Sequence, residues 1–359
     1  MVIYRSKASI LENNVMKRKA LILFVLAGLL PLMSLAQVEK AKNSGTFSFY
    51  LENDFFFQID RYYTNGAKLS WISPDLKEVA EGLDLARWFY SLFKGAFFVD
   101  RPEFQHAVSF SIGNDIYTPD DLTRSDLIVN ERPYAGMSYI GIGFHNKSSR
   151  RMSTLEFDLG IVGPYSFSGT FQKAVHNCLG YEYPFGWDNQ LKDEPALRVI
   201  YDHKWKLLKW QFGKDFGFDW IAYMRGGLGN VYTGAGLGME VRWGFTLPDD
   251  FGTFPIRPGG DVTDIKRRSS SFSRQGRFGV HVFAAVEGQA VLRDIFLDGN
   301  TFRDSHSVDK EPFVADLMVG VSLRINRFKL FYSQVYLTRR FKVQLYEQRY
   351  GSLNLSFSY

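Results

Sequence analysis

The sequence contains almost no cysteine, because Cys178 is the only one among its 359 residues. A disulfide within the chain is therefore impossible, and a cysteine-rich metal site is excluded. The formal net charge is only +5, and no cluster of lysines and arginines resembles a nucleic-acid-binding arm. The mean hydropathy is −0.17 although 45% of the residues are hydrophobic. We therefore expect apolar residues dispersed among polar ones, and no nucleic-acid partner.

Long apolar runs are also lacking, except for one near the N-terminus. The basic residues Lys17, Arg18 and Lys19 precede an apolar stretch at 20–32, and a small-residue cleavage site follows at 34–36. This order predicts a signal peptide, with Met16 as the true start and 1–36 as leader and signal peptide. A transmembrane helical anchor is the alternative, but the run is shorter than the roughly 20 residues that a membrane span needs. We expect 37–359 to be the exported domain.

Aromatic residues and glycine are abundant, with 33 Phe, 19 Tyr, 7 Trp and 32 Gly. Apolar and polar residues alternate in many segments, most clearly at the C-terminus. There Leu353, Leu355, Phe357 and Tyr359 alternate with Ser352, Asn354, Ser356 and Ser358. Such a period of two predicts β-strands with one apolar face.

A soluble β-sandwich also has alternating strands, but three features favour a barrel in a membrane. The segments are roughly ten residues or longer, which is the spanning length of a tilted strand. The charged residues Glu240, Arg242 and Glu287 fall on the polar face, as a wet lumen permits. The chain ends in the aromatic Tyr359, which resembles the C-terminal signal of outer-membrane barrels.

The fold class predicted is all-β: a transmembrane antiparallel up-and-down barrel of about twelve strands, monomeric and located in the outer membrane. The expected strands are 45–54, 64–73, 104–114, 134–146, 151–162, 195–208, 211–230, 234–246, 276–292, 312–325, 328–341 and 349–359. With both termini periplasmic, the outer loops are 55–63, 115–133, 163–194, 231–233, 293–311 and 342–348. The periplasmic connections 75–98, which has helical periodicity, and 247–275 are unusually long.

Polar residues gather in four places that this topology puts at the outer rim. They are the end of the first strand (52–54), the start of the second (60–66), the segment 114–124 and the loop 163–194. Taken singly, each reads most simply as a turn or a solvated loop. Together they contain a carboxylate for a hard cation, a histidine base, and amide and hydroxyl groups, which are the components of an ester hydrolase.

These clusters resemble a known family, the lipid A 3′-O-deacylases of the bacterial outer membrane. The motifs that carry the resemblance are Glu52-Asn53-Asp54, Tyr63-Thr64-Asn65-Gly66, Asn114-Asp115-Ile116-Tyr117-Thr118-Pro119, Glu131-Arg132-Pro133-Tyr134-Ala135-Gly136, Val162-Gly163-Pro164, Gln172 four residues before His176, Gly186-Trp187-Asp188-Asn189-Gln190 and Gly229-Asn230. The resemblance covers nearly the whole mature chain. It implies a twelve-stranded barrel that uses Ca²⁺ to hydrolyse the ester-linked acyl group at the 3′ position of lipid A.

The resemblance also assigns roles to individual residues. The functional Asn-Asp pair of the family falls on Asn53 and Asp54, its hydroxyl on Thr64 and its histidine on His176. A supporting glutamine and glutamate are matched by Gln172 and Glu182, and a lysine of the family is replaced by Arg124. These matches imply His176 as general base on a water, Asp54 as calcium ligand, Asn53 and Thr64 as orienting groups, and Arg124 as a contact to a lipid A phosphate.

Alternatives remain at this stage. A serine acyl-enzyme competes with an activated water, although no serine shows a nucleophile-elbow context. A porin or scaffold barrel without activity, or an outer-membrane phospholipase, would also explain the barrel pattern.

Two further expectations concern local geometry. Strand alternation points the side chain of Asp54 to the lumen face and that of Asn53 to the lipid face. Both can therefore serve one site only if a bulge or a strand end lies at these residues. His176, in an outer loop, is expected to be exposed and to support little packing.

Overall fold

The computed structural model describes residues 45–57, 60–77, 84–95, 97–98, 101, 103–213, 215–252 and 278–359. The predicted leader and signal peptide at 1–36 lie outside the described residues, as does most of the connection 247–275. The predictions for these segments therefore stay predictions.

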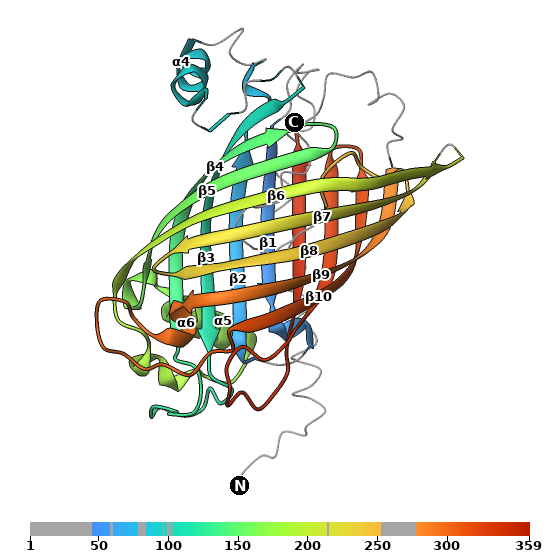
Figure 1. Ribbon diagram of the computed structural model, residues 1–359. Coiled ribbons are helices and arrows are strands. Elements are labelled where there is room, and N and C mark those ends of the chain that lie inside the picture. Colours follow the sequence, from blue (N-terminus) through green and yellow to red (C-terminus); the bar gives the residue numbers. More distant parts are fainter. Residues whose placement is uncertain are drawn as a thin grey trace.

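Twelve antiparallel strands form a closed barrel, with each strand hydrogen-bonded to its sequence neighbours and β1 paired with β12 (Figure 1). The strands are β1 (Thr46–Asn53), β2 (Tyr62–Ile72), β3 (Gln105–Thr118), β4 (Ala135–Lys147), β5 (Arg151–Val162), β6 (Glu194–Phe212), β7 (Phe216–Gly229), β8 (Tyr232–Phe245), β9 (Phe278–Asp294), β10 (Phe313–Ile325), β11 (Phe328–Leu337) and β12 (Gln348–Ser358). The predicted fold class and all twelve predicted strands are confirmed.

Alternation along each strand separates a lipid face from a lumen face, as β1 and β12 illustrate where they close the barrel. Thr46 bonds to Ser358 and Ser48 to Ser356 on the buried lumen side. On the opposite side, Phe47 is 44% exposed and its ring lies beside that of Tyr359. The register therefore places the polar side chains inside and the apolar ones toward lipid.

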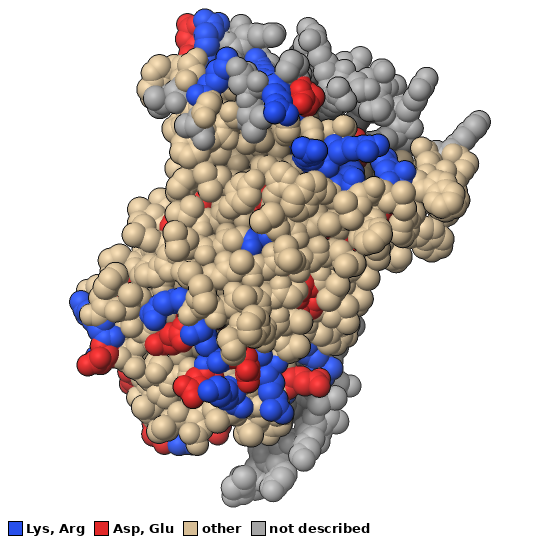
Figure 2. Space-filling view, viewed as in Figure 1, with Lys and Arg blue, Asp and Glu red and all other residues tan. Residues whose placement is uncertain are grey.

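The face shown in Figure 2 carries a broad band that is nearly free of charge, with its charged residues gathered toward the two ends of the molecule. The charges of the barrel wall instead face inward, where Glu240, Arg242 and Glu287 are all buried, as predicted. The buried ion pairs of the lumen include Lys68–Glu156, Arg198–Asp158, Arg225–Asp202, Arg242–Asp219, Arg242–Asp250 and Lys329–Asp250. No helix in the described part of the chain is long and apolar enough to cross a membrane.

The two ends of the barrel differ in their connections (Figure 1). The short turn at 148–150, the helix α4 (Asp84–Phe93) and the C-terminus lie at one end. The helices α5 (Ser168–Leu179) and α6 (Ile295–Asp298) lie at the other. Short periplasmic turns and long outer loops are typical of outer-membrane barrels, which assigns α5 and α6 to the outer side.

The predicted helical segment 75–98 is confirmed only for α4. Residues 78–83 of the predicted segment lie outside the described part of the chain. Trp88, placed on the apolar face by its spacing, is 60% exposed. Two aromatic residues that follow Trp88 pack against the barrel instead: the rings of Phe93 and Phe97 lie against Phe144 of the outer wall.

Candidate functional site

The first strand ends where the polar cluster begins. β1 stops at Asn53, and the 3-10 helix η2 (Asp54–Phe57) starts at the next residue. Asn53 donates to Asn65 Oδ1 at 3.2 Å, and its own Oδ1 accepts from the Phe55 N–H at 2.7 Å. The strand thus ends between Asn53 and Asp54, as is necessary if these two adjacent residues are to serve one site.

A β-bulge on β2 completes this arrangement. Tyr63 pairs with Tyr117 and Asn65 with Ile116, so that Thr64 is the extra residue. Tyr63 OH donates to Glu52 in the lumen at 2.8 Å. Thr64 Oγ1 instead shares a hydrogen bond of 2.7 Å with Thr118 Oγ1. A bulge re-aims one side chain, and here it brings Thr64 to the same side of the wall as Asn65.

The loop 163–194 folds into a helix that the sequence did not predict. In α5 the buried residues are Ser168, Gln172, His176 and Leu179, spaced by four, four and three positions on one face. The face toward the barrel is therefore mostly polar. The aromatic Phe171 is 51% exposed on the other side, and this inverted pattern hides the helix from a search for an apolar stripe.

Small residues and a polar cluster hold the start of α5 against the lipid-facing wall. A Cβ on Gly136 of β4 would meet the Ser168 side chain at 2.1 Å, so only glycine allows this approach. Asn114 of β3 donates through Nδ2 to Ser138 Oγ, Ser168 Oγ and the Ser166 carbonyl, at 2.9, 2.8 and 3.4 Å. The site is thus built outside the barrel lumen, between its wall and α5.

His176 is buried, with 4% of its surface exposed, so the expectation of an exposed loop residue was wrong. Its Nδ1 donates to the Glu182 carbonyl at 2.5 Å, and its Nε2 lies 3.1 Å from Asp60 Oδ2. Burial lowers the pKa of His176, but the hydrogen bond and charge of Asp60 and the Glu182 carbonyl outweigh it, so that the pKa lies above its usual value.

Asp54 is the most deeply buried carboxylate of the site, with 1% exposed. Its Oδ2 accepts from the Arg61 N–H at 2.6 Å, while its Oδ1 is buried without a hydrogen-bond partner. Burial and the charge of Asp60 raise the pKa of Asp54 well above its usual range. The backbone N–H and the charge of Arg61 offset these effects only in part, and a hard cation is a partner that would stabilise the charged form of Asp54.

The residues around Asp54 determine which further ligands such an ion would have. Across the described ranges, no group of three or more His, Cys, Asp or Glu side chains is placed to hold a metal. An ion at Asp54 would therefore need carbonyl, amide or water oxygens as its remaining ligands. Ca²⁺ accepts such a mixed oxygen shell, so the residues present fit this ion.

The supporting residues predicted from the sequence have three different outcomes. Gln172 is buried in α5 and accepts from Trp187 Nε1 at 2.7 Å, which ties the helix to the fully buried indole. Glu182 contributes its backbone carbonyl to His176, whereas its residue surface is exposed. Arg124 is exposed and paired with Asp126. The structure thus brings Asn53, Asp54, Thr64, Gln172 and His176 to one region, and it assigns Arg124 no contact there.

Two residues of this region, Asp60 and Thr118, were not predicted as site residues from the sequence. Asp60 was noted in the polar cluster 60–66, but only the fold shows that it meets a histidine 116 positions later. Thr118 lies in the motif at 114–119 and faces Thr64 through the bulge. Asp60 and Thr118 could be recognised in the sequence as polar residues near strand ends, but no sequence pattern indicated which residues they contact.

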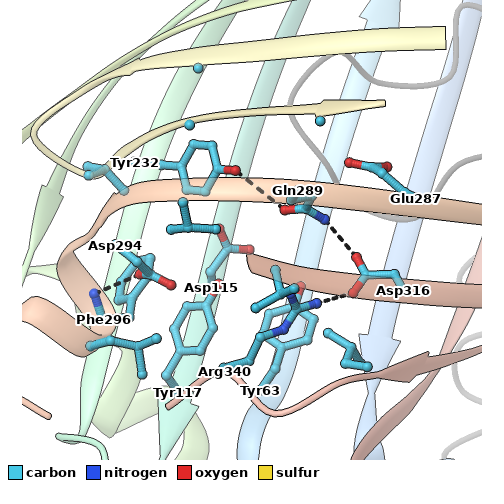
Figure 3. Close-up of a pocket in the computed structure, with 18 of the residues that line it drawn as sticks. Tyr63, Asp115, Tyr117, Tyr232, Glu287, Gln289, Asp294, Phe296, Asp316 and Arg340 are labelled. Atoms are coloured by element: carbon cyan, nitrogen blue, oxygen red, sulfur yellow. Dashed lines mark hydrogen bonds and ion pairs between the residues drawn. The ribbon is translucent and has the colours of Figure 1, made fainter. Parts of the chain in front are cut away.

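A separate cavity of about 200 Å³ lies inside the lumen (Figure 3). Asp316 accepts from Gln289 at 2.8 Å and is paired with Arg340, while Asp115 and Tyr117 reach in from β3. Phe296 stacks on Tyr117 with ring centroids 4.1 Å apart. The cavity contains ion pairs but no histidine, so it lacks the base that the outer-wall site provides.

Comparisons with known proteins identify the family of the chain and a solved structure of the same fold. The model of the family described as "Outer membrane protein LpxR" matches residues 21–359. Among solved structures, LpxR from Salmonella typhimurium superposes with a TM-score of 0.67 and 18% identity, over 87% of this chain and 99% of that chain. The β domain of the Bordetella autotransporter BrkA reaches a TM-score of 0.41 at 8% identity, over 88% and 98%. Comparison with curated protein sequences gives no match.

Proposed function

Because the chain belongs to the family of the outer membrane protein LpxR, we propose that it is a lipid A deacylase that hydrolyses the 3′-linked acyl ester. The observation that carries this proposal is the His176–Asp60 pair, placed on the lipid-facing side of the barrel wall beneath α5. A base in this position lies on the side of the wall that faces the lipids of the outer leaflet, and not in the lumen.

The aromatic surface around α5 supports a lipid substrate. Tyr165, Phe167 and Phe171 are 65%, 67% and 51% exposed. Exposed aromatic rings next to a membrane-spanning band are typical of residues at the headgroup level. The site therefore opens where an ester between a sugar and an acyl chain is located.

The hydrogen bonds of His176 define how it would act. Donation from Nδ1 to the Glu182 carbonyl keeps that nitrogen protonated, which makes Nε2 the basic atom. When a water molecule takes its place between Nε2 and Asp60, Nε2 accepts a proton as the water attacks the ester carbonyl. Asp60 then stabilises the imidazolium that forms, because its carboxylate carries the opposite charge.

Asn53, Thr64 and Asp54 line the same region and complete the machinery. Asp54 would hold Ca²⁺, which, when bound, supplies positive charge for the developing oxyanion. The Thr64 hydroxyl and the Asn53 amide orient the ester or the attacking water through hydrogen bonds. His176 has the Glu182 carbonyl and Asp60 as its hydrogen-bond partners and no serine among the described residues, which favours an activated water over a serine acyl-enzyme.

The porin alternative has less support. Ion pairs line the lumen, and Phe296 and Tyr117 stack on each other near its outer end. The phospholipase alternative differs only in the substrate, so it needs an experiment.

The test uses the purified, folded protein with lipid A and, separately, with phospholipid vesicles that lack lipopolysaccharide. Mass spectrometry should find lipid A that has lost its 3′-linked chain, and no fatty acid released from the vesicles. Release from vesicles with intact lipid A would contradict the proposal and identify a phospholipase.

A further inference from the structure

A shallow groove of about 510 Å³ crosses the outer wall from β1 to β5. Its ridges are the apolar side chains of Leu69, Ile112, Ile140 and Leu159, which are 52–58% exposed and face the bilayer. Its floor contains smaller side chains, those of Ala67, Asn114 and Ser138. A narrow apolar channel on a lipid-facing wall fits an acyl chain.

The groove is continuous with the candidate site. Asn114 and Ser138 line the groove and also hold the start of α5. Ala67 pairs with Asn114 on the neighbouring strand, and Asn65 pairs with Asn53. Asn65 and Ala67 are two positions apart on the strand, which corresponds to roughly 7 Å. A chain attached to an ester at the site therefore enters the groove within a few carbon atoms.

One polar atom at the end of the groove is without a partner. Asn114 uses its Nδ2 for three acceptors, but its Oδ1 is buried without a hydrogen bond. A buried acceptor in this state calls for a donor. The chains of diacyl phospholipids carry only ester carbonyls near their heads, which are acceptors. A hydroxylated or amide-linked acyl chain carries an O–H or N–H donor there.

We propose that the groove binds one acyl chain of the lipid substrate and that Asn114 Oδ1 accepts a hydrogen bond from a hydroxyl or amide N–H near the head of that chain. This inference rests on the proposed function for its substrate, a lipid A molecule in the outer leaflet. Any membrane lipid fills an apolar groove, so the preference for hydroxylated or amide-linked chains comes from the unpaired acceptor.

The test fills the groove by Ala67→Trp and compares it with Ala222→Trp. Ala222 shares the lipid face of β7 with Trp220 and Met224 and lies outside the groove. Both variants add an indole on a lipid-exposed face, so both should fold and show the parent's gel mobility. Ala67→Trp should lower deacylation of lipid A by ~10²-fold, the effect of displacing a substrate by about 1 Å. Equal rates for the two variants would refute the groove.

A binding experiment separates this inference from the proposed function. His176→Ala, alone and combined with either tryptophan variant, is mixed in detergent with purified hexa-acyl lipid A or with dipalmitoyl phosphatidylglycerol. Native mass spectrometry counts the bound lipid. Ala67→Trp should reduce lipid A binding at least tenfold, and phosphatidylglycerol should bind more weakly than lipid A to the protein with the open groove.

The outcomes of the binding experiment are distinct. Equal lipid A binding with and without Ala67→Trp overturns the groove, even if the parent protein deacylates lipid A. Loss of binding in a protein whose parent has no deacylase activity supports the groove and refutes the proposed function. Phosphatidylglycerol binding as strong as lipid A binding overturns the role of Asn114. A synthetic analogue without the chain hydroxyl identifies the donor, since it binds more weakly only if the hydroxyl bonds to Asn114.

Discussion

Replacement of His176 by alanine is the most direct perturbation of the proposed chemistry. The change removes the Nε2 base and the hydrogen bonds to Asp60 and Glu182. Loss of a general base lowers the rate by ~10²–10⁴-fold. That range corresponds to about 2.7–5.5 kcal/mol of transition-state stabilisation.

The cost to stability should be smaller and local. An acceptor left buried without a partner costs about 1–3 kcal/mol. The Asp60 side chain is 31% exposed and Glu182 is an exposed residue, so water can replace the lost donor at both. The cost should be at the low end of that range and confined to α5. His176 lies outside the barrel lumen, so the twelve strands should still close.

The assay compares His176→Ala with His306→Ala, another histidine of the outer loops. His306 Nε2 bonds to the Glu131 carbonyl at 2.7 Å, so its removal also breaks a hydrogen bond between loops. Heat-modified gel mobility reports barrel folding, and mass spectrometry of lipid A reports the product. Both variants should fold, and only His176→Ala should lose activity. A folded His176→Ala that works at the parent rate would refute the proposed mechanism.

Three other predictions follow from the contacts around the site and in the lumen. Asp60→Asn removes the charge that raises the pKa of His176. His176 then becomes neutral at lower pH, so the acidic limb of the pH–rate profile should move to lower pH. An acidic limb that stays in place or moves to higher pH contradicts the pairing of Asp60 with His176. Asp54→Asn should abolish both the deacylase activity and the calcium binding measured by titration calorimetry. A chelator should inactivate the parent protein, and Ca²⁺ rather than Mg²⁺ should restore the activity. Full activity in excess chelator would exclude a calcium ion from the mechanism. Arg242→Leu removes the arginine that pairs with buried Asp219 and one of the two cations that pair with buried Asp250. It should destabilise the barrel by about 3–5 kcal/mol, seen as a lower temperature of the gel-mobility shift. Unchanged stability would show that water replaces the arginine.

The sequence predicted the barrel well, because each strand is a local pattern. Alternation with a period of two decides which residues face lipid and which face the lumen. It placed Glu240 and Arg242 inside, where both are buried. Strand lengths suited to a membrane, together with the final Tyr359, distinguished the barrel from a sandwich, and the closed pairing of β1 with β12 agrees.

The site depends on contacts that no local pattern encodes. The resemblance to a family selected His176, Asp54 and Thr64, but it did not include Asp60, which approaches His176 only because α5 folds back onto the wall. The helix itself was missed because its buried face is polar, so that its pattern differs from that of an ordinary amphipathic helix. Arg124, matched across a loop, pairs with Asp126 instead.

The sequence by itself thus determined the membrane barrel, the order and approximate positions of its twelve strands and the inward position of its charges, since hydrophobic alternation acts residue by residue. The tertiary structure decided which polar residues meet. The bulge at Thr64, the end of β1 at Asn53 and the close approach at Gly136 are set by strand pairing and by the packing of α5. These contacts join residues on different strands and loops, and the pairing of His176 with Asp60 spans 116 positions, so no local pattern in the sequence encodes them.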